Sequence, residues 1–296
     1  MKLFSDKHLL RILCGFAVFL GLSALALEGM ATGAPPALPK LKSETEVAFD
    51  RYVRLTEERN ATELKLGSSF LWIDRLPEEQ RKNAYESLRA GTPKIEKRET
   101  KDGGKEIHCP NGMIHHWEAV SYIPGATVED VLRVLEDYDH HSEYYKPDVE
   151  RSKTVEHDGN HYVAFLRFRR HKVITVTLNT THDVNYFRDS PERAHSRSSA
   201  TKISEIENAG KSNEREKAPG GDGGFLWRME TWWRMEEKDG GVYIQSEVVS
   251  LTRDIPTGMG WVIGPFVSGI PKESLAFTME ATRKAVLAKK QRAGTG

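Results

Sequence analysis

Cysteine is nearly absent from the sequence: Cys14 and Cys109 are the two copies among 296 residues. Cys14 lies in an N-terminal segment that we expect to be removed, which leaves Cys109 on its own. A single cysteine cannot form an intrachain disulfide. The fold therefore has to rest on its hydrophobic core.

The sequence also lacks a net charge. Its 43 basic and 43 acidic residues balance, and the two signs are interspersed along the chain. A nucleic-acid partner requires a basic stripe or patch, so nucleic acid is excluded as a partner. Near neutrality also argues against binding to a membrane by bulk electrostatics.

Motifs for metal or catalytic chemistry are missing as well. The sequence contains no H-E-x-x-H motif, no metal-type pair of cysteines, no nucleophile elbow and no glycine-rich phosphate loop. Eleven histidines are present, but adjacent strand residues point to opposite faces, so His115 and His116 cannot share one ion. We expect no metal and no cofactor, and we interpret the histidines mainly as surface residues or sheet hydrogen-bonders.

An acid–base pair is the remaining catalytic candidate. His182 and Asp183 end one strand pattern, and Arg253 and Asp254 end another. A histidine beside a carboxylate can act as acid and base, yet neighbours on a strand face opposite ways. We therefore expect salt bridges at strand ends, predict no catalytic residue and leave an enzyme role open.

The first 34 residues have the layout of a secretory signal peptide. Lys2, Lys7 and Arg11 precede an uncharged apolar run over 12–27, and small residues follow. The run is shorter than the roughly 20 apolar residues of a spanning helix, which favours cleavage over an anchor. We expect an exported, periplasmic or extracellular protein whose mature chain begins between residues 27 and 35.

The remaining chain divides into four parts. Residues 35–42 are a proline-rich linker, and 43–111 predict a helical extension with an exposed hairpin around a D-G-G turn. Residues 112–290 form one strongly patterned segment, and 291–296 a flexible tail. Within the extension we expect helices over 44–59 and 77–88 and a buried connector over 68–76.

The segment 112–290 predicts one strand, one helix, a meander of six strands and a long C-terminal helix. Thr127 followed by Asp130 indicates a capping box at the start of the first helix. This order excludes a parallel doubly wound sheet, which needs alternating units throughout. The expected strands are 112–125, 148–157, 161–170, 172–187, 193–207, 224–237 and 241–253, and the last helix covers 271–290.

This order resembles that of the START-like (helix-grip, SRPBCC) superfamily. The resemblance includes "PGATVEDVLRVLEDYDHHSEYYKPDVERSKTV" and the "RDIPTG…IPKESL" passage that leads into the terminal helix. The superfamily includes lipid-transfer domains, plant hormone receptors, birch-pollen-type allergens and polyketide cyclases. The resemblance covers 112–290, and 43–111 has no counterpart. It implies an α+β helix-grip fold, in which a curved antiparallel sheet of about seven strands grips the C-terminal helix around a cavity.

The residues that would line this cavity lie on the apolar faces of the strands and on the last helix. An ordinary packed core is the alternative for each of them, and the resemblance favours the cavity. Arg197 either binds an anionic head group or lies at an open edge of the sheet. The candidate ligand-binding residues are Phe168, Ile174, Val176, Leu178, Arg197, Trp227, Met229, Thr231, Trp233, Trp261, Phe266, Leu275 and Met279.

The apolar stretch 254–270 predicts a loop between the last strand and the last helix. Its glycines permit unusual backbone angles, and Trp261 and Phe266 offer apolar surface to a ligand or a bilayer. The loop is either a gate that makes transient membrane contact through 258–268 or a static lid on the core.

Together these patterns predict an exported binding or carrier protein for a hydrophobic small molecule that is lipid-like, isoprenoid or polyketide-like. One alternative is a cyclase- or hydrolase-type enzyme of the same fold. The other is a structural or interaction module with a filled core, in which residues 43–111 form the partner surface.

Overall fold

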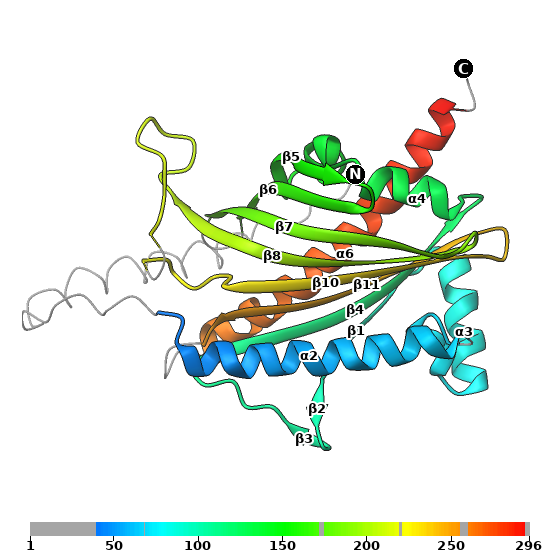
Figure 1. Cartoon of the computed structure of the whole chain (residues 1–296), viewed down its shortest axis with the longest axis horizontal. Coiled ribbons are helices and arrows are strands. Elements are labelled where there is room, and N and C mark those ends of the chain that lie inside the picture. The colour runs from blue at the N-terminus through cyan, green and yellow to red at the C-terminus, as the bar shows by residue number, and fades with distance from the viewer. Residues whose placement is uncertain (1–39, 68, 172–174, 219–220, 255–259, 294–296) are drawn as a thin grey trace, which may run out of the picture. The chain divides into compact units, whose positions relative to one another are not determined.

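The strands expected from the alternating patterns build one antiparallel sheet (Figure 1). The computed structural model describes residues 40–67, 69–171, 175–218, 221–254 and 260–293, without the side chains of residues 260–268 and 293. Within these ranges the sheet has nine strands in the order β1-β4-β11-β10-β8-β7-β6-β5, with β9 paired to β8. The strands are β1 (Lys94–Lys97), β4 (Gly112–Pro124), β5 (Val149–Asp158), β6 (His161–His171), β7 (Thr175–Ser190), β8 (Arg193–Glu207), β9 (Arg215–Glu216), β10 (Arg228–Lys238) and β11 (Gly241–Arg253).

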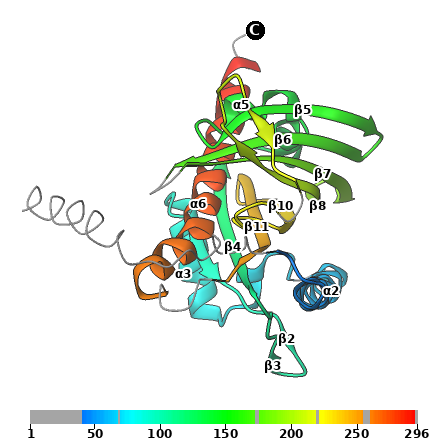
Figure 2. The same ribbon diagram turned by 90° about the vertical axis from the view of Figure 1, so that its left-hand side faces the viewer.

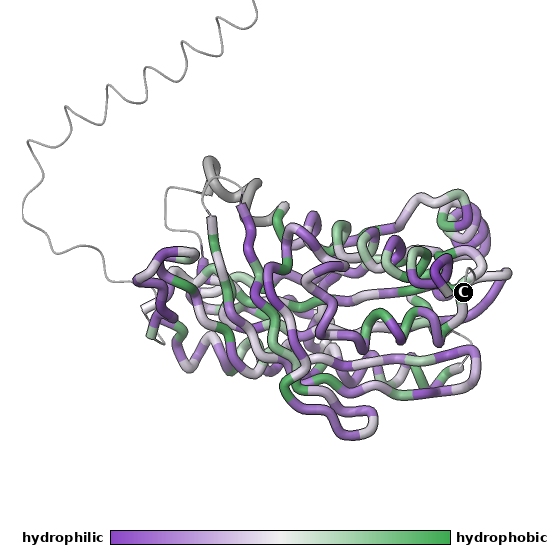
Figure 3. Tube along the Cα trace, turned by 90° about the horizontal axis from the view of Figure 1, so that it is seen from above, coloured by the Kyte–Doolittle hydropathy of each residue, from purple (hydrophilic) through white to green (hydrophobic). Residues whose placement is uncertain are grey.

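The turn between β10 and β11 fixes the register of the two central strands. Asp239 and Gly240 both have positive φ angles, 56° and 73°, and Lys238 pairs directly with Gly241. Two such residues in a row make the primed turn that matches the twist of a tight hairpin. Because side chains alternate along each strand, this turn decides which residues of β10 and β11 share a face. The alternation of hydrophilic and hydrophobic residues can be followed along the chain in Figure 3.

One face of the sheet, the inner face, packs against α4 (Val128–Leu135) and α6 (Gly260–Ala293) (Figure 2). Thr127 and Asp130 form the capping box of α4, since each side chain accepts a hydrogen bond from the other residue's backbone N–H. The short helices η2 (Tyr138–His140) and α5 (His141–Tyr144) then lead into β5. The core of this layer includes Ala119, Ile123, Val131, Leu132, Met235, Ile244, Met279 and Val286.

The opposite, outer face is covered by α2 (Ser43–Leu66), η1 (Trp72–Arg75) and α3 (Glu78–Arg89). In Figure 2, α2 and α6 lie on opposite sides of β10 and β11. The segment 43–111 is therefore a third layer of the same unit, and its β1 strand pairs with β4. The apolar residues of this layer are Phe49, Tyr52, Val53, Trp227, Trp232, Val249 and Leu251 in one cluster, and Phe70–Ile73, Ala84, Tyr85, Leu88, Val120, Tyr122 and Tyr243 in another.

The fold class predicted from the sequence is confirmed: a large antiparallel sheet with a C-terminal helix and a helical N-terminal segment. The D-G-G hairpin is present as β2 (Lys101–Asp102) and β3 (Lys105–Glu106). Two expectations are wrong. The described sheet has nine strands rather than about seven, since β1 and β9, which are short and highly charged, were not expected to join it. The last helix begins at Gly260 rather than 271, although its glycines and prolines disfavour a helix, because tertiary context can override intrinsic propensity.

No helix in the described part of the chain is long and apolar enough to cross a membrane.

Candidate functional site

Packing on the inner face is uneven along the central strands. At the end near α4, Met235 and Ile244 are completely buried against Met279 and Val286. Farther along the same strands the side chains of the inner face are only half-buried. This half-buried set, the Trp233 patch, consists of Trp117, Met229, Thr231, Trp233 and Val248.

The position of Trp233 makes this exposure informative. Trp233 lies in the middle of β10, and β10 is flanked on both sides by hydrogen-bonded strands. Its indole therefore keeps accessible surface on the side of the sheet that faces α6. A tightly packed interior leaves no such surface on a large aromatic side chain.

Small hydroxyl side chains surround Trp233 on its own face. Ser196 of β8 and Ser246 of β11 are its two register partners, and both are buried. Ser198 faces the neighbouring Thr231 in the same way. Serine fills much less volume than the leucine or isoleucine usual in such a layer, so the side chains beside the indole on the two neighbouring strands are small and polar.

The Ser246 hydroxyl is an unsatisfied polar group. The residue is 1% exposed, and its Oγ has no hydrogen-bond partner among the described residues. A buried hydroxyl without a partner costs about 1–3 kcal/mol. Such a cost is uncommon in a finished core and calls for a physical explanation.

Three histidines of the inner side are buried and neutral. Burial lowers the pKa of His115, His141 and His182 to about 4 in each case. His115 Nε2 lies 3.0 Å from the Thr252 hydroxyl, and His141 Nε2 donates to the Val134 carbonyl at 3.1 Å. These side chains are sheet and helix hydrogen-bonders rather than the surface residues that the sequence also allowed.

The bonds of His182 fix its tautomer. The Thr180 hydroxyl donates to the Leu166 carbonyl at 3.0 Å, so it accepts from His182 Nε2 at 2.8 Å. The other ring nitrogen, Nδ1, is then the acceptor that faces the Ser198 hydroxyl at 3.5 Å. Both ring nitrogens are engaged, and the lowered pKa keeps the ring uncharged.

The acid–base pair considered from the sequence does not form. His182 lies on the inner face, while Asp183 accepts a hydrogen bond from His161 at 2.8 Å on the other side of β7. Asp183 lies within β7 rather than at a strand end, and its polar partner is His161. Among the described residues no group of three or more histidine, cysteine, aspartate or glutamate side chains is placed to hold a metal ion.

Most of the predicted site residues lie on the inner side. Met229, Thr231 and Trp233 belong to the Trp233 patch, and Val176 and Phe168 are half-buried on the same face of β7 and β6. Phe168 packs beside Phe277 of α6. Leu178, Leu275 and Met279 are buried in the core. Ile174 and the side chains of Trp261 and Phe266 lie outside the described residues.

Two predicted site residues are on the wrong side of the sheet. Arg197 pairs in register with Trp232 on the outer face, where it binds Glu57 of α2 and lies 3.7 Å from Glu230. Trp227 packs in the same cluster as Trp232, under α2, because it precedes the start of β10 and does not follow its alternation. Arg197 therefore lies on the face opposite the Trp233 patch.

Trp117, Ser246 and Val248 belong to the site but were not predicted. Strand β11 is buried on both faces, so its sequence shows no clean alternation of polar and apolar residues. Ser246 could have been found as the residue opposite Trp233 on β11, but this requires knowing which strands pair and in what register.

The outer face carries a buried network of charges beneath α2. Glu247 is 1% exposed and accepts from His116 Nε2 at 2.6 Å and from Asn60 Nδ2 at 2.9 Å, and it also pairs with Arg59. Glu118 is equally buried, 3.1 Å from Arg98 and 2.7 Å from the amide of Gln245. The charged residues Glu230, Arg234 and Glu236 of β10 are buried on this face as well.

Burial and neighbours move the two carboxylates of this network in opposite directions. Burial, reinforced by the nearby Glu247, raises the pKa of Glu118 to about 8. Burial alone would raise the pKa of Glu247, but the hydrogen bond from His116 and the Arg59 charge lower it below its usual value. Glu247 is ionised and Glu118 is the carboxyl that retains its proton near neutral pH.

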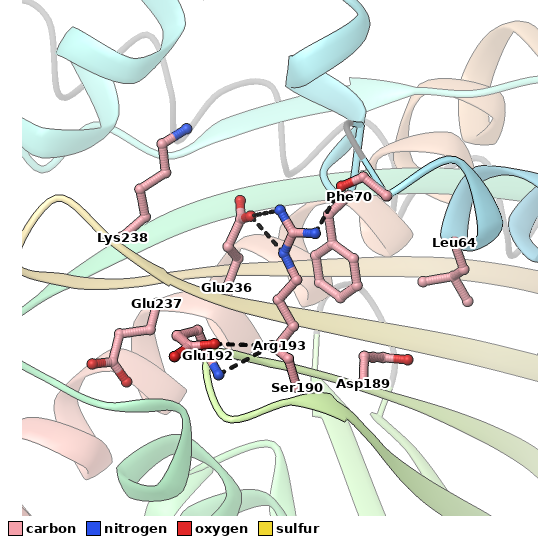
Figure 4. Close-up of a pocket in the computed structure, with 10 residues that line it drawn as sticks. Leu64, Phe70, Asp189, Ser190, Glu192, Arg193, Glu236, Glu237 and Lys238 are labelled. Atoms are coloured by element: carbon pink, nitrogen blue, oxygen red, sulfur yellow. Dashed lines mark hydrogen bonds and ion pairs between the residues drawn. The ribbon is translucent and has the colours of Figure 1, made fainter.

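A separate pocket of about 720 Å³ lies at one end of the sheet, between the end of α2 and the β7–β8 turn (Figure 4). Its polar groups are bound to one another. Arg193 donates to Glu236 at 2.8 Å and to the Gly67 carbonyl at 2.7 Å, and its guanidinium lies over the Phe70 ring. Glu237 accepts from the Val128 backbone. The pocket contains no described buried polar group that waits for a ligand.

No protein-family model matches the sequence, and no curated protein matches it. Solved structures do match. The protein TTHA0849 from Thermus thermophilus is 17% identical, with a TM-score of 0.43 over 58% of this chain and 97% of that chain. A STAR-related lipid transfer protein from Xanthomonas axonopodis is 15% identical, with a TM-score of 0.42 over 64% and 98%. Human STARD10 is 10% identical, with a TM-score of 0.45 over 75% and 84%.

The solved structures similar to this chain thus include proteins of the START type, the superfamily that the sequence resembles. With TM-scores below 0.5, these likenesses do not extend to a ligand.

Proposed function

We propose that this chain is a binding or carrier protein for a hydrophobic small molecule held between the inner face of the sheet and α6. The observation that carries the proposal is the Trp233 patch, a largely apolar set of inner-face side chains that stay only partly buried. A ligand that buries about 400 Å² of apolar surface gains on the order of 10 kcal/mol before ordering costs.

The chemistry of the inner face favours binding over catalysis. His141 and His182 are uncharged, and their ring nitrogens are engaged by the protein. The buried carboxylates Glu118 and Glu247 lie on the outer face beneath α2, away from the patch. A cyclase- or hydrolase-type role is therefore not the function that this geometry supports.

Export and membrane contact complete the proposal. The charge and hydropathy pattern of the first 34 residues supports secretion to the periplasm or the extracellular space, and the apolar sequence over 258–268 supports transient contact with a bilayer during ligand exchange. N-terminal sequencing of protein from the native host should give a first residue between 27 and 35. A cytoplasmic protein that retains Met1 would contradict export.

Native mass spectrometry of the protein purified from cells tests the binding function. We expect a co-purified apolar molecule, or, after delipidation, saturable binding of the neutral apolar fluorophore diphenylhexatriene. Met229→Glu should abolish that binding, because it places a carboxylate in the apolar patch.

The matched control is Thr201→Glu, which adds the same charge at an exposed position of β8 and should leave binding unchanged. The proposal is wrong if the wild-type protein carries no apolar molecule and binds no fluorophore, or if both glutamate variants bind equally well.

A further inference from the structure

Three parts of the fold offer unused chemistry: the pocket at Arg193, the charge network at Glu247 and the Ser246 hydroxyl. In the first two, the charged side chains are paired with other charged side chains of the protein. Ser246 Oγ differs, because it is buried on the inner face of β11 and has no partner among the described residues. Its register partner on β10 is Trp233, which is half-buried, so the buried hydroxyl lies on the strand next to a residue that keeps accessible surface.

The second polar atom at this place belongs to Trp233 itself. Its indole N–H makes no hydrogen bond with any described residue, whereas the outward-facing Trp227 donates to Asp222 at 3.1 Å. A buried or half-buried tryptophan usually finds a partner for this group. On neighbouring strands of one face, side chains in register have their Cβ atoms about 5 Å apart. The Trp233 indole N–H, which can only donate, and the Ser246 hydroxyl, which can donate and accept, therefore belong to neighbouring residues of one face.

The charges around the patch narrow the chemistry of the missing partner. His182 is neutral, and Arg170, at the far end of the inner face, is paired with Asp148 and lies 3.5 Å from Glu273. Lys272 stands over the ring of Trp117, a member of the patch, at 5.8 Å. The immediate neighbours of Ser246 on its face, Ala119 and Trp233, carry no charge. A neutral group suits this position better than a carboxylate or an ammonium.

We propose that Ser246 and Trp233 form the polar subsite of the ligand, and that the ligand carries an uncharged hydroxyl or carbonyl group on its apolar body. This inference rests on the proposed binding function and specifies the ligand class: an alcohol, ketone or ester rather than a pure hydrocarbon or a fatty-acid anion. The Trp233 N–H donates to the ligand oxygen, and the Ser246 hydroxyl donates to a carbonyl or exchanges a hydrogen bond with an alcohol.

Dodecanol and dodecane test the subsite, because they differ only by one hydroxyl. Each is titrated against bound diphenylhexatriene in the wild-type protein and in Ser246→Ala. We expect Ser246→Ala to weaken displacement by dodecanol about five- to tenfold and to leave displacement by dodecane unchanged. Ser199→Ala is the matched control, since it removes a hydroxyl from the outer face of the same sheet.

The melting temperature of the ligand-free protein provides a second readout. Removing a hydroxyl that lacks a partner should leave the melting temperature of Ser246→Ala unchanged or raise it. A lower melting temperature together with unchanged dodecanol affinity means that the hydroxyl serves the fold alone, and this result overturns the subsite.

If Ser246→Ala weakens displacement by dodecanol and by dodecane equally, the subsite is also overturned, because the substitution then acts through the shape of the site and not through the hydroxyl. If neither compound displaces the fluorophore from the wild-type protein and no fluorophore binds, the binding function itself fails. The two failures are therefore distinguishable.

Discussion

His116 and Glu247 are joined by a hydrogen bond of 2.6 Å at a place where both side chains are 1% exposed. His116 donates through Nε2, and its Nδ1 accepts from the Tyr52 hydroxyl at 2.9 Å. That hydroxyl in turn accepts from the backbone N–H of Thr100 at 2.8 Å. One chain of bonds therefore connects β11, β4 and α2, and it holds the N-terminal layer on the sheet.

Removing Glu247 should destabilise the protein strongly. Glu247→Ala leaves His116 and Arg59 without their buried acceptor, and breaking a buried charged pair costs about 3–5 kcal/mol. Urea denaturation followed by far-ultraviolet circular dichroism measures the free energy of unfolding. Glu58→Ala, which breaks the exposed pair with Arg54 on α2, is the control and should have little effect. Similar losses in the two variants would show that the network does not anchor α2.

Acid should destabilise the inner layer. The pKa of His115, His141 and His182 is lowered to about 4, so the folded state prefers their neutral forms. Their stabilising contribution is complete above the ordinary value of about 6.5 and is lost as the pH falls from there towards 4. A shift of this size corresponds to on the order of 3 kcal/mol for a fully buried histidine. The melting temperature should therefore fall between pH 6.5 and 4.

His141→Gln should reduce the fall in melting temperature between pH 6.5 and 4, because glutamine keeps a donor for the Val134 carbonyl and takes up no proton. His108→Gln, at a position that is not buried, should leave this fall in melting temperature unchanged. If the melting temperature falls equally steeply in the wild type and in both variants, the loss of stability belongs to other groups.

Glu118 should have the opposite dependence on pH. Its pKa is raised to about 8, mainly by burial, so the folded state prefers the protonated carboxyl. The contribution of this preference is complete below the ordinary value near 4.5 and is lost as the pH rises through 8. Glu118→Gln keeps the shape and removes the charge, so its stability should be less sensitive to pH between 5 and 8. An unchanged profile would indicate that Glu118 is ionised in the folded protein.

Trp233 and Met235 should respond differently to truncation although they are two residues apart on one face of β10. Met235 is completely buried, so Met235→Ala should cost about 2–5 kcal/mol. Trp233→Ala should cost less than this despite the larger side chain, because part of the indole surface is already uncovered. It should also weaken the binding of diphenylhexatriene. A larger loss of stability for Trp233→Ala in the ligand-free protein would mean that the patch is filled core.

Local signals in the sequence determined many of the elements. The capping box of Thr127 and Asp130 begins α4, and the Asp239–Gly240 turn closes the β10–β11 hairpin where the sequence predicts. Both motifs act within a few residues, through bonds or backbone angles that depend on the local chain alone. Alternation along β10 likewise assigned Met229, Thr231 and Trp233 to one face before the sheet was known.

Only the tertiary structure decided what lies against each face. Arg197 and Trp227 were expected at the ligand, but α2 covers the outer face and binds both of them there. The same covering turns Glu118 and Glu247 from surface charges into buried partners. These outcomes depend on contacts between α2 and strands far away in the sequence, and no local pattern encodes them. The unpaired hydroxyl of Ser246 is of the same kind, because a serine lacks a partner only when the strands and helices around it have taken their places.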